Sequence, residues 1–200
     1  MRYRGYGSPG LGIVGYIIIT CVVLYIAVSI NQNLISLFGF APVDLTGQPF
    51  RPWTLVTSIF THAPFPNFTH ILFNMIVLYF FGGFLVNLLG SRVFLLVFFL
   101  GGLAGNLFFM LLASSPMSTV IGASGAIFAV EGTLVVMRPK LPVFVFPIPA
   151  PIPLWAAVIG GFLLTFYAAS DIAWQAHLGG LIFGALAGFF FRLRERRQLF

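Results

Sequence analysis

Three polar residues in separate apolar segments of the chain carry side chains suited to hydrolysis. Ser124, His177 and Asn74 each interrupt a long hydrophobic run. Polar side chains are costly in hydrocarbon and tend to be functional where they occur there. A hydroxyl, an imidazole and an amide can serve as nucleophile, general base and donor to an oxyanion. If the three residues lie at one depth, they predict a serine hydrolase built inside a bilayer.

The composition predicts an integral membrane protein. Of the 200 residues, 60% are hydrophobic and 7% are charged, and the mean hydropathy is +1.05. A soluble domain carries about 25% charged residues, so this chain has too few to cover a water-exposed surface. At about twenty residues per span, the length allows about six helices. The fold class we expect is an all-α polytopic membrane protein, a bundle of six transmembrane helices forming one domain over residues 1–200.

Two proline-rich segments separate the expected spans. The segment 32–67 also contains aromatic residues, so we expect an interfacial loop with short helices, anchored by Trp53. The six prolines of segment 138–153 exclude a continuous helix and favour an extended chain along the interface. The first apolar run is expected to be a retained span and not a cleaved signal peptide. The expected spans are 11–31, 68–89, 93–113, 119–137, 153–170 and 172–191.

The positions of the basic residues predict the orientation of the chain. With the N-terminus in the cytoplasm, nine of the ten basic residues fall on the inner side and only Arg51 falls outside. Both termini are then cytoplasmic, and the second, fourth and sixth spans begin at the outer face. Counted from the start of its span, Asn74 lies roughly 9 Å deep, and Ser124 and His177 roughly 8 Å. The active site should therefore face outward.

Other functional classes find little support in the sequence. The net charge of +6 comes from basic residues at span ends, without an aromatic-interleaved stripe, so we expect no nucleic-acid partner. Cys21 is the single cysteine, which excludes an intrachain disulfide and a cysteine-based metal site. We expect no metal and no cofactor. The sequence does not predict an oligomeric state.

Glycines surround the serine and follow the histidine. An intramembrane serine more often bonds a carbonyl of the preceding turn or serves as a small packing residue, and Gly122 and Gly125 are compatible with that interpretation. The histidine alone is equally compatible with a bond to a neighbouring carbonyl. However, the glycines that follow it share its helical face, which would allow the fourth span to approach until the imidazole reaches Ser124. These residues are Gly180, Gly184 and Gly188.

Further polar residues lie in the same spans. His70 and Asn74 are four residues apart and share a face of the second span, where they form either oxyanion donors or an interhelical polar clamp. Asn106 in the third span is interpreted as structural. Asp171 lies off the helical face of His177, which favours a Ser–His dyad over a triad. Glu131 follows Ser124 by seven residues, about 10 Å deeper, and without a relay partner it is weak evidence for ion conduction.

Three sequence strings match a known family in their order along the chain. They are HILFN at 70–74, GASGA at 122–126 and AHLGGLIFG at 176–184, and Arg51-Pro52-Trp53 resembles the family's first-loop Trp-Arg element in altered order. The chain resembles the rhomboid intramembrane serine proteases over nearly its whole length. The resemblance implies a Ser124–His177 dyad and an oxyanion hole formed by His70, Asn74 and the Ser124 N–H, with Gly122 supporting the loop. It assigns no role to His62.

The function implied is cleavage of transmembrane protein substrates near the outer face of the lipid bilayer. The likeness also implies that substrates reach the site between the second and fifth spans, with the fifth mobile. Because a regular helix hides its carbonyls in backbone hydrogen bonds, substrates should carry helix-weakening residues near the cut. Two alternatives remain: an inactive rhomboid-like scaffold that binds membrane clients, and a small transporter, which would show inverted repeats and a midplane site.

Overall fold

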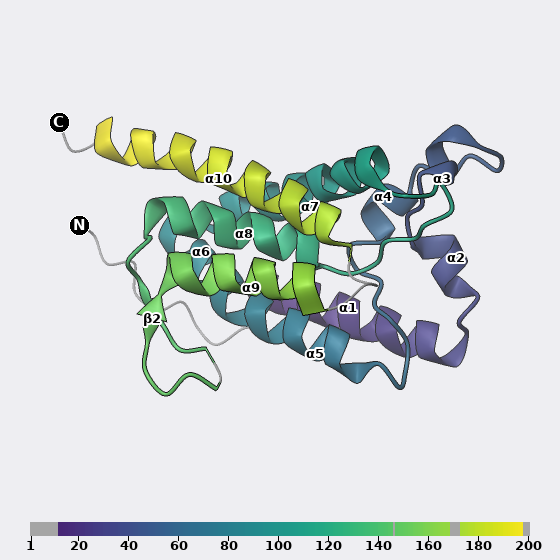
Figure 1. Ribbon diagram of the computed structural model, residues 1–200, viewed down its shortest axis with the longest axis horizontal. Helices are drawn as coiled ribbons and strands as arrows, with labels where there is room; N and C mark the ends of the chain where they lie inside the picture. The colour runs from purple at the N-terminus through teal and green to yellow at the C-terminus, as the bar shows by residue number, and fades with distance from the viewer. Residues whose placement is uncertain (1–11, 146, 169–172, 198–200) are drawn as a thin grey trace.

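The chain folds as a bundle of apolar helices in the computed structural model, which describes residues 12–145, 147–168 and 173–197 (Figure 1). Within this part of the chain, four helical segments are long and apolar enough to cross a membrane: α1 (Ile13–Ile30), the continuous stretch Phe68–Leu89, α7 (Ser91–Leu112) and α10 (Trp174–Arg197). The other two apolar helices, α8 (Ser124–Met137) and α9 (Leu154–Ala168), are shorter. The prediction of an all-α membrane bundle is confirmed, whereas the count of six spans stays a prediction.

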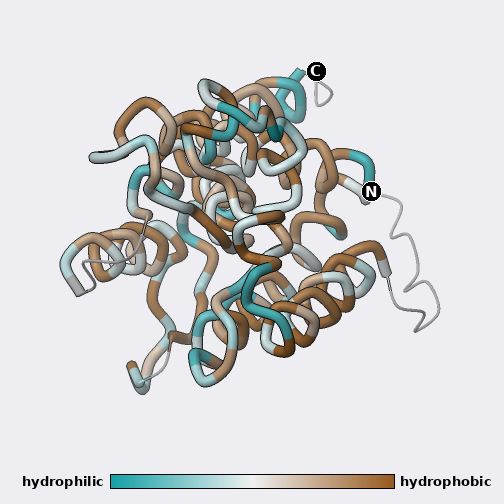
Figure 2. The backbone as a smooth tube through the Cα atoms, turned by 90° about the vertical axis from the view of Figure 1, so that its right-hand side faces the viewer, coloured by the Kyte–Doolittle hydropathy of each residue, from teal (hydrophilic) through white to brown (hydrophobic). Residues whose placement is uncertain are grey.

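The second expected span is one helical stretch with a local change of pitch. It comprises α5 (Phe68–Val77), the π-helical turn η1 (Leu78–Gly82) and α6 (Gly83–Leu89). Hydrophobic residues follow the helices of the bundle, and hydrophilic residues gather in the connections and near the C-terminal end (Figure 2). This distribution is the one expected for helices whose apolar side chains face lipid.

Helix α8 is the centre of the bundle. It contacts α7, α9, α10 and η1, and it lies between α10 and α9 in Figure 1. Eleven of its 14 residues are buried. A helix that is buried on all sides carries its functional groups away from lipid, so any reactive side chain on α8 is shielded by the surrounding helices.

Helices α8 and α10 run parallel and in very close contact. A β-carbon added to Gly180 would lie 1.9 Å from the Gly125 carbonyl oxygen, and one on Gly184 would lie 2.0 Å from the Ala129 carbonyl oxygen. The paired positions rise together by four residues along both helices, which is the register of parallel helices packed face to face. The two backbones touch at a separation that only glycine permits.

The helix of the fourth expected span is shorter at its N-terminal end than that span. Helix α8 begins at Ser124 and not near residue 119, because Val120 forms an antiparallel bridge with Phe40 and Gly122 has a φ of +120°. A left-handed residue and a strand-like bridge both stop helix propagation. Ser124 therefore lies at the first position of its helix, and the depth of 8 Å counted from residue 119 does not apply.

The sixth span is longer than expected. Helix α10 continues to Arg197, six residues past the expected end, because arginine is a good helix former and the polar end needs no apolar cover. Arg138 follows α8 and pairs with Glu195 on α10, with Nη1 donating to Oε2 at 3.0 Å. Arg192 donates to the Val136 carbonyl at 3.1 Å. These contacts join the C-terminal ends of the two parallel helices.

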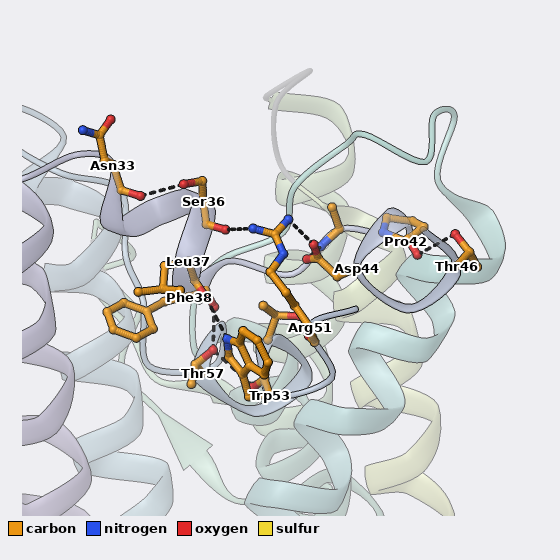
Figure 3. A network of polar contacts seen from close by, with 12 residues as sticks. Asn33, Ser36, Leu37, Phe38, Pro42, Asp44, Thr46, Arg51, Trp53 and Thr57 are labelled. Atoms are coloured by element: carbon orange, nitrogen blue, oxygen red, sulfur yellow. Dashed lines mark hydrogen bonds and ion pairs between the residues drawn. The ribbon is translucent and has the colours of Figure 1, made fainter. Parts of the chain in front are cut away.

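The segment after α1 folds as the loop with short helices that its composition predicts. It holds α2 (Leu34–Phe38), α3 (Val43–Thr46) and α4 (Thr54–Thr57). Figure 3 shows Arg51 between the Ser36 carbonyl and Asp44, and the Trp53 indole donating to the Leu37 carbonyl, which it does at 3.1 Å. The bonds from Arg51 to Ser36 and from Trp53 to Leu37 attach the loop to α2, and the Arg51–Asp44 ion pair attaches it to α3.

The second proline-rich segment contains a small hairpin. Strand β1 (Pro142–Val143) pairs antiparallel with β2 (Ile152–Pro153), with Val143 opposite Ile152. The expected absence of a continuous helix holds for the described residues between α8 and α9. The prolines suit this position because a two-residue edge pairing needs few backbone donors.

Candidate active site

Ser124 and His177 meet across two helices. Ser124 is the first residue of α8 and is half-buried, and His177 lies in the first turn of α10 with 5% of its surface exposed. The His177 Nε2 lies 2.7 Å from the Ser124 Oγ. The contact depends on the glycine packing of α8 against α10, because it forms at the end where Gly125 and Gly180 bring the backbones together.

The other ring nitrogen of His177 contacts a residue that the sequence did not single out. His177 Nδ1 lies 3.2 Å from Thr165 Oγ1 on α9, and the Thr165 hydroxyl donates to the Phe162 carbonyl at 2.8 Å. A threonine in an apolar span usually bonds its own helix, so this contact could not be predicted from the amino-acid sequence. It appears only once α9 packs beside α10.

An aromatic ring packs against the His177 imidazole. The Phe128 ring lies 4.7 Å from the His177 ring, centroid to centroid, at an interplanar angle of 33°. Phe128 in turn meets Phe162 of α9 edge to face at 6.0 Å. Phe128 is four residues after Ser124, one helical turn away, so the spacing places both on one face of α8. This four-residue spacing is the feature of the sequence from which the role of Phe128 could have been predicted.

The strand-like segment before Ser124 is fixed by the first loop. Val120 exchanges backbone hydrogen bonds with Phe40, and the Gly122 N–H donates to the Ser58 carbonyl at 2.9 Å. The next N–H, of Ala123, points to His62 Nε2 at 3.5 Å. The loop between α1 and α5 thus sets the position of the serine, which neither its composition nor the proline count indicated.

His70 lies against Gly122, close to the serine. A β-carbon on Gly122 would lie 2.8 Å from His70 Nε2 and 3.7 Å from Ser124 Oγ, so only glycine lets the imidazole come this near. The Ala63 N–H points to His70 Nδ1 at 3.4 Å. A neutral imidazole whose Nδ1 accepts carries its proton on Nε2, which makes His70 a donor on the side of Gly122.

Asn74 lies one turn further along α5 and is 8% exposed. Its Nδ2 donates to the His70 carbonyl at 2.7 Å, which commits one of its two N–H donors to its own helix. The other donor is the one that an oxyanion would use. This bond lies within α5, so it is not an interhelical clamp, and the role of Asn74 as an oxyanion donor stays a prediction.

The remaining predicted residues have varied positions. Asn106 donates to the Leu55 carbonyl at 2.7 Å and to Ser58 Oγ at 2.9 Å, so it ties α7 to the first loop. Glu131 is buried within α8. Asp171 lies outside the described residues. In the described ranges, no three His, Cys, Asp or Glu side chains cluster closely enough to hold a metal ion.

His62 is fully buried in the loop beneath the serine segment. Its Nδ1 lies 3.1 Å from the Phe60 carbonyl, and its ring is 5.2 Å from that of His70. Burial, together with the nearby charge of His70, lowers the pKa of His62 to about 3 from an ordinary value of 6.5. The folded protein therefore keeps His62 neutral over a range in which the unfolded chain protonates it.

We expect this histidine to make folding stability depend on pH. Between pH 6.5 and about 3 the unfolded state binds more protons than the folded state. The free energy of unfolding therefore decreases as the pH is lowered, with a limiting slope of about 1.4 kcal/mol per pH unit from this group. Above pH 6.5 His62 is neutral in both states, and the protein keeps the full stability that is lost at lower pH. Melting temperatures in detergent between pH 7.5 and 5 should fall more steeply for the parent than for His62→Gln. Parallel curves would show that His62 is not the group responsible.

The fold and the site together define a class: a polytopic helical membrane protein with a serine and a histidine in hydrogen-bond contact between two of its helices. Comparison with known proteins gives the family. The model of the rhomboid domain matches residues 49–194, nearly three quarters of the sequence, and the chain belongs to the rhomboid family of intramembrane proteases.

Several curated relatives support this assignment. RHOMBOID-like protein 12, mitochondrial, of Arabidopsis thaliana is 32% identical over 190 residues, covering 85% of this chain and 53% of the relative. Rhomboid protein 1, mitochondrial, of Saccharomyces cerevisiae is 30% identical over 165 residues, covering 72% and 43%. Rhomboid protease GluP of Bacillus subtilis is 31% identical over 160 residues, covering 80% and 30%. The chain spans about half or less of the length of these relatives.

Proposed function

We propose that this protein is a serine endopeptidase that hydrolyses peptide bonds of transmembrane substrates within the bilayer. The observation that carries the proposal is the 2.7 Å contact between His177 Nε2 and Ser124 Oγ. A hydroxyl is a weak nucleophile until a base within about 3 Å accepts its proton. The two residues are 53 positions apart and belong to different helices. Their contact joins two side chains and is not the bond to a nearby backbone carbonyl that each residue could have made by itself.

In the proposed reaction Ser124 attacks the scissile carbonyl carbon and His177 takes the hydroxyl proton. The new C–O bond gives a tetrahedral intermediate whose oxyanion needs preorganised donors. His70 Nε2–H, the free N–H of Asn74 and the Ser124 N–H are the proposed donors. Ser124 begins α8, so its backbone N–H is among the four that the helix leaves without an internal acceptor.

Collapse of that intermediate breaks the C–N bond, and His177 returns the proton to the leaving amine. The acyl-enzyme ester on Ser124 is then hydrolysed by a water molecule that His177 deprotonates, which restores the serine. The family relationship supports this sequence of steps, since relatives such as GluP are named proteases. With the N- and C-termini in the cytoplasm, as the basic residues predict, the cut falls near the outer membrane face.

Labelling with a fluorophosphonate tests the proposal directly. The reagent should modify one residue, and mass spectrometry of the digested protein should locate it at Ser124. Modification should fall at least about 100-fold in His177→Ala, because the hydroxyl loses its base. Labelling that survives this substitution unchanged would remove His177 as the base. A folded parent protein that takes up no label would instead indicate the inactive scaffold, which binds clients without cleaving them.

A further inference from the structure

We infer that Thr165 on α9 is a positioning residue for the base, holding His177 in the tautomer that can accept the serine proton. The inference rests on the proposed function, because it concerns how the same dyad is prepared for reaction. It depends on the two hydrogen bonds of a single hydroxyl group.

The direction of the hydrogen bonds follows from a count of protons. Thr165 Oγ1 lies 2.8 Å from the Phe162 carbonyl oxygen, which can only accept, so the hydroxyl proton is used there. The same oxygen lies 3.2 Å from His177 Nδ1 and must therefore accept from it. A neutral imidazole with its proton on Nδ1 has a free lone pair on Nε2. That lone pair faces the Ser124 hydroxyl at 2.7 Å.

The opposite tautomer would prevent the first step. If the proton were on Nε2, the ring would present a donor to Ser124 Oγ and could not remove the serine proton. In soluble serine proteases a carboxylate on Nδ1 fixes the tautomer. No carboxylate contacts His177 Nδ1 among the described residues, and the neutral Thr165 hydroxyl occupies the corresponding position.

The orientation of Thr165 fits this role. Its neighbours Leu164 and Phe166 are 67% and 45% exposed, whereas Thr165 is half-buried and faces the bundle. Phe162, whose carbonyl accepts the hydrogen bond from the Thr165 hydroxyl, also packs with its ring against the Phe128 ring, which contacts His177. One turn of α9 thus contacts the base through both a hydrogen bond and an aromatic chain. Displacement of α9 from the bundle would remove the acceptor from Nδ1.

The test compares three variants by the second-order rate of fluorophosphonate labelling at Ser124. Thr165→Val keeps the shape but loses the hydroxyl, and we expect a fall of about 10- to 100-fold, the range found when an orienting partner of a functional histidine is removed. Thr165→Ser restores the hydroxyl and should recover the rate to within about threefold. Thr20→Val is the matched control, since the Thr20 hydroxyl donates to the Tyr16 carbonyl of its own helix, and it should label at the parental rate.

A second readout separates positioning from folding. In cleavage of a model transmembrane substrate by the detergent-solubilised full chain, Thr165→Val should lower kcat by a similar factor and leave KM within about twofold. Equal labelling rates for Thr165→Val and the parent would overturn the inference alone, as would a Thr165→Ser rate as low as that of Thr165→Val. A parent protein that is not labelled at Ser124 would overturn the proposed function together with this inference.

Discussion

Replacing Ser124 by alanine is expected to lower cleavage of a transmembrane substrate by about 10³-fold or more, because the substitution removes the attacking oxygen itself. His177 Nε2 then has no hydroxyl within 2.7 Å to deprotonate, and the proposed oxyanion donors cannot compensate for a missing nucleophile. The measurement is the initial rate of cleavage in detergent, followed by gel and by mass spectrometry of the two products.

Folding is the necessary control for Ser124→Ala. The side chain is half-buried, and its hydroxyl bonds His177, so we expect the melting temperature and the elution volume to stay close to those of the parent. Unchanged turnover in a folded Ser124→Ala protein would exclude this serine as the nucleophile. Because the substitution is small and adds no atoms, a loss of activity with an intact fold can be assigned to chemistry.

Replacing Gly180 by alanine is expected to cost both stability and activity. Its new β-carbon would lie 1.9 Å from the Gly125 carbonyl oxygen, well inside van der Waals contact, so α8 and α10 must separate. Overpacking of this kind typically costs about 1–3 kcal/mol. Because His177 is three residues before Gly180, the separation also lengthens the contact with Ser124. A displacement of about 1 Å can reduce the rate about 100-fold.

The matched control for that variant is Gly160→Ala. Gly160 lies within α9, and a β-carbon there would meet no heavy atom within 4 Å. The substitution should therefore leave the melting temperature unchanged or raise it slightly, since alanine favours a helix over glycine. Both proteins would be compared by thermal unfolding in detergent and by fluorophosphonate labelling. Equal behaviour of Gly180→Ala and Gly160→Ala would contradict the close contact of α8 with α10.

The sequence was most informative where one physical constraint acts along a single helix. Gly180, Gly184 and Gly188 predicted close helix packing because their spacing leaves one face without side chains, and the structure has α8 at that face. The hydrophobic spans were recognisable for a similar reason, since a span needs about twenty apolar residues wherever it packs. Helix boundaries were less predictable: residues 119–123 are apolar enough for a helix, but the backbone bonds of Val120 to Phe40 and of Gly122 to Ser58 keep this segment out of α8.

Several contacts of the site could not be read from the chain. Ser58 and His62 position the segment before the serine from more than sixty residues away, and Thr165 meets His177 only through the packing of α9. In the sequence, a single threonine or histidine is at least as often explained by a bond to a carbonyl of its own helix or loop as by a contact with a distant residue. Only the partners found in three dimensions distinguish these cases.

The sequence by itself determined the membrane character, the helical class and the candidate residues for hydrolysis, because each follows from composition or from spacing along one helix. The tertiary structure decided which side chains meet the two ring nitrogens of His177, where α8 begins and which loop contacts the segment before Ser124. Those features depend on hydrogen bonds between segments that are distant in sequence, and no periodicity in the chain encodes their partners.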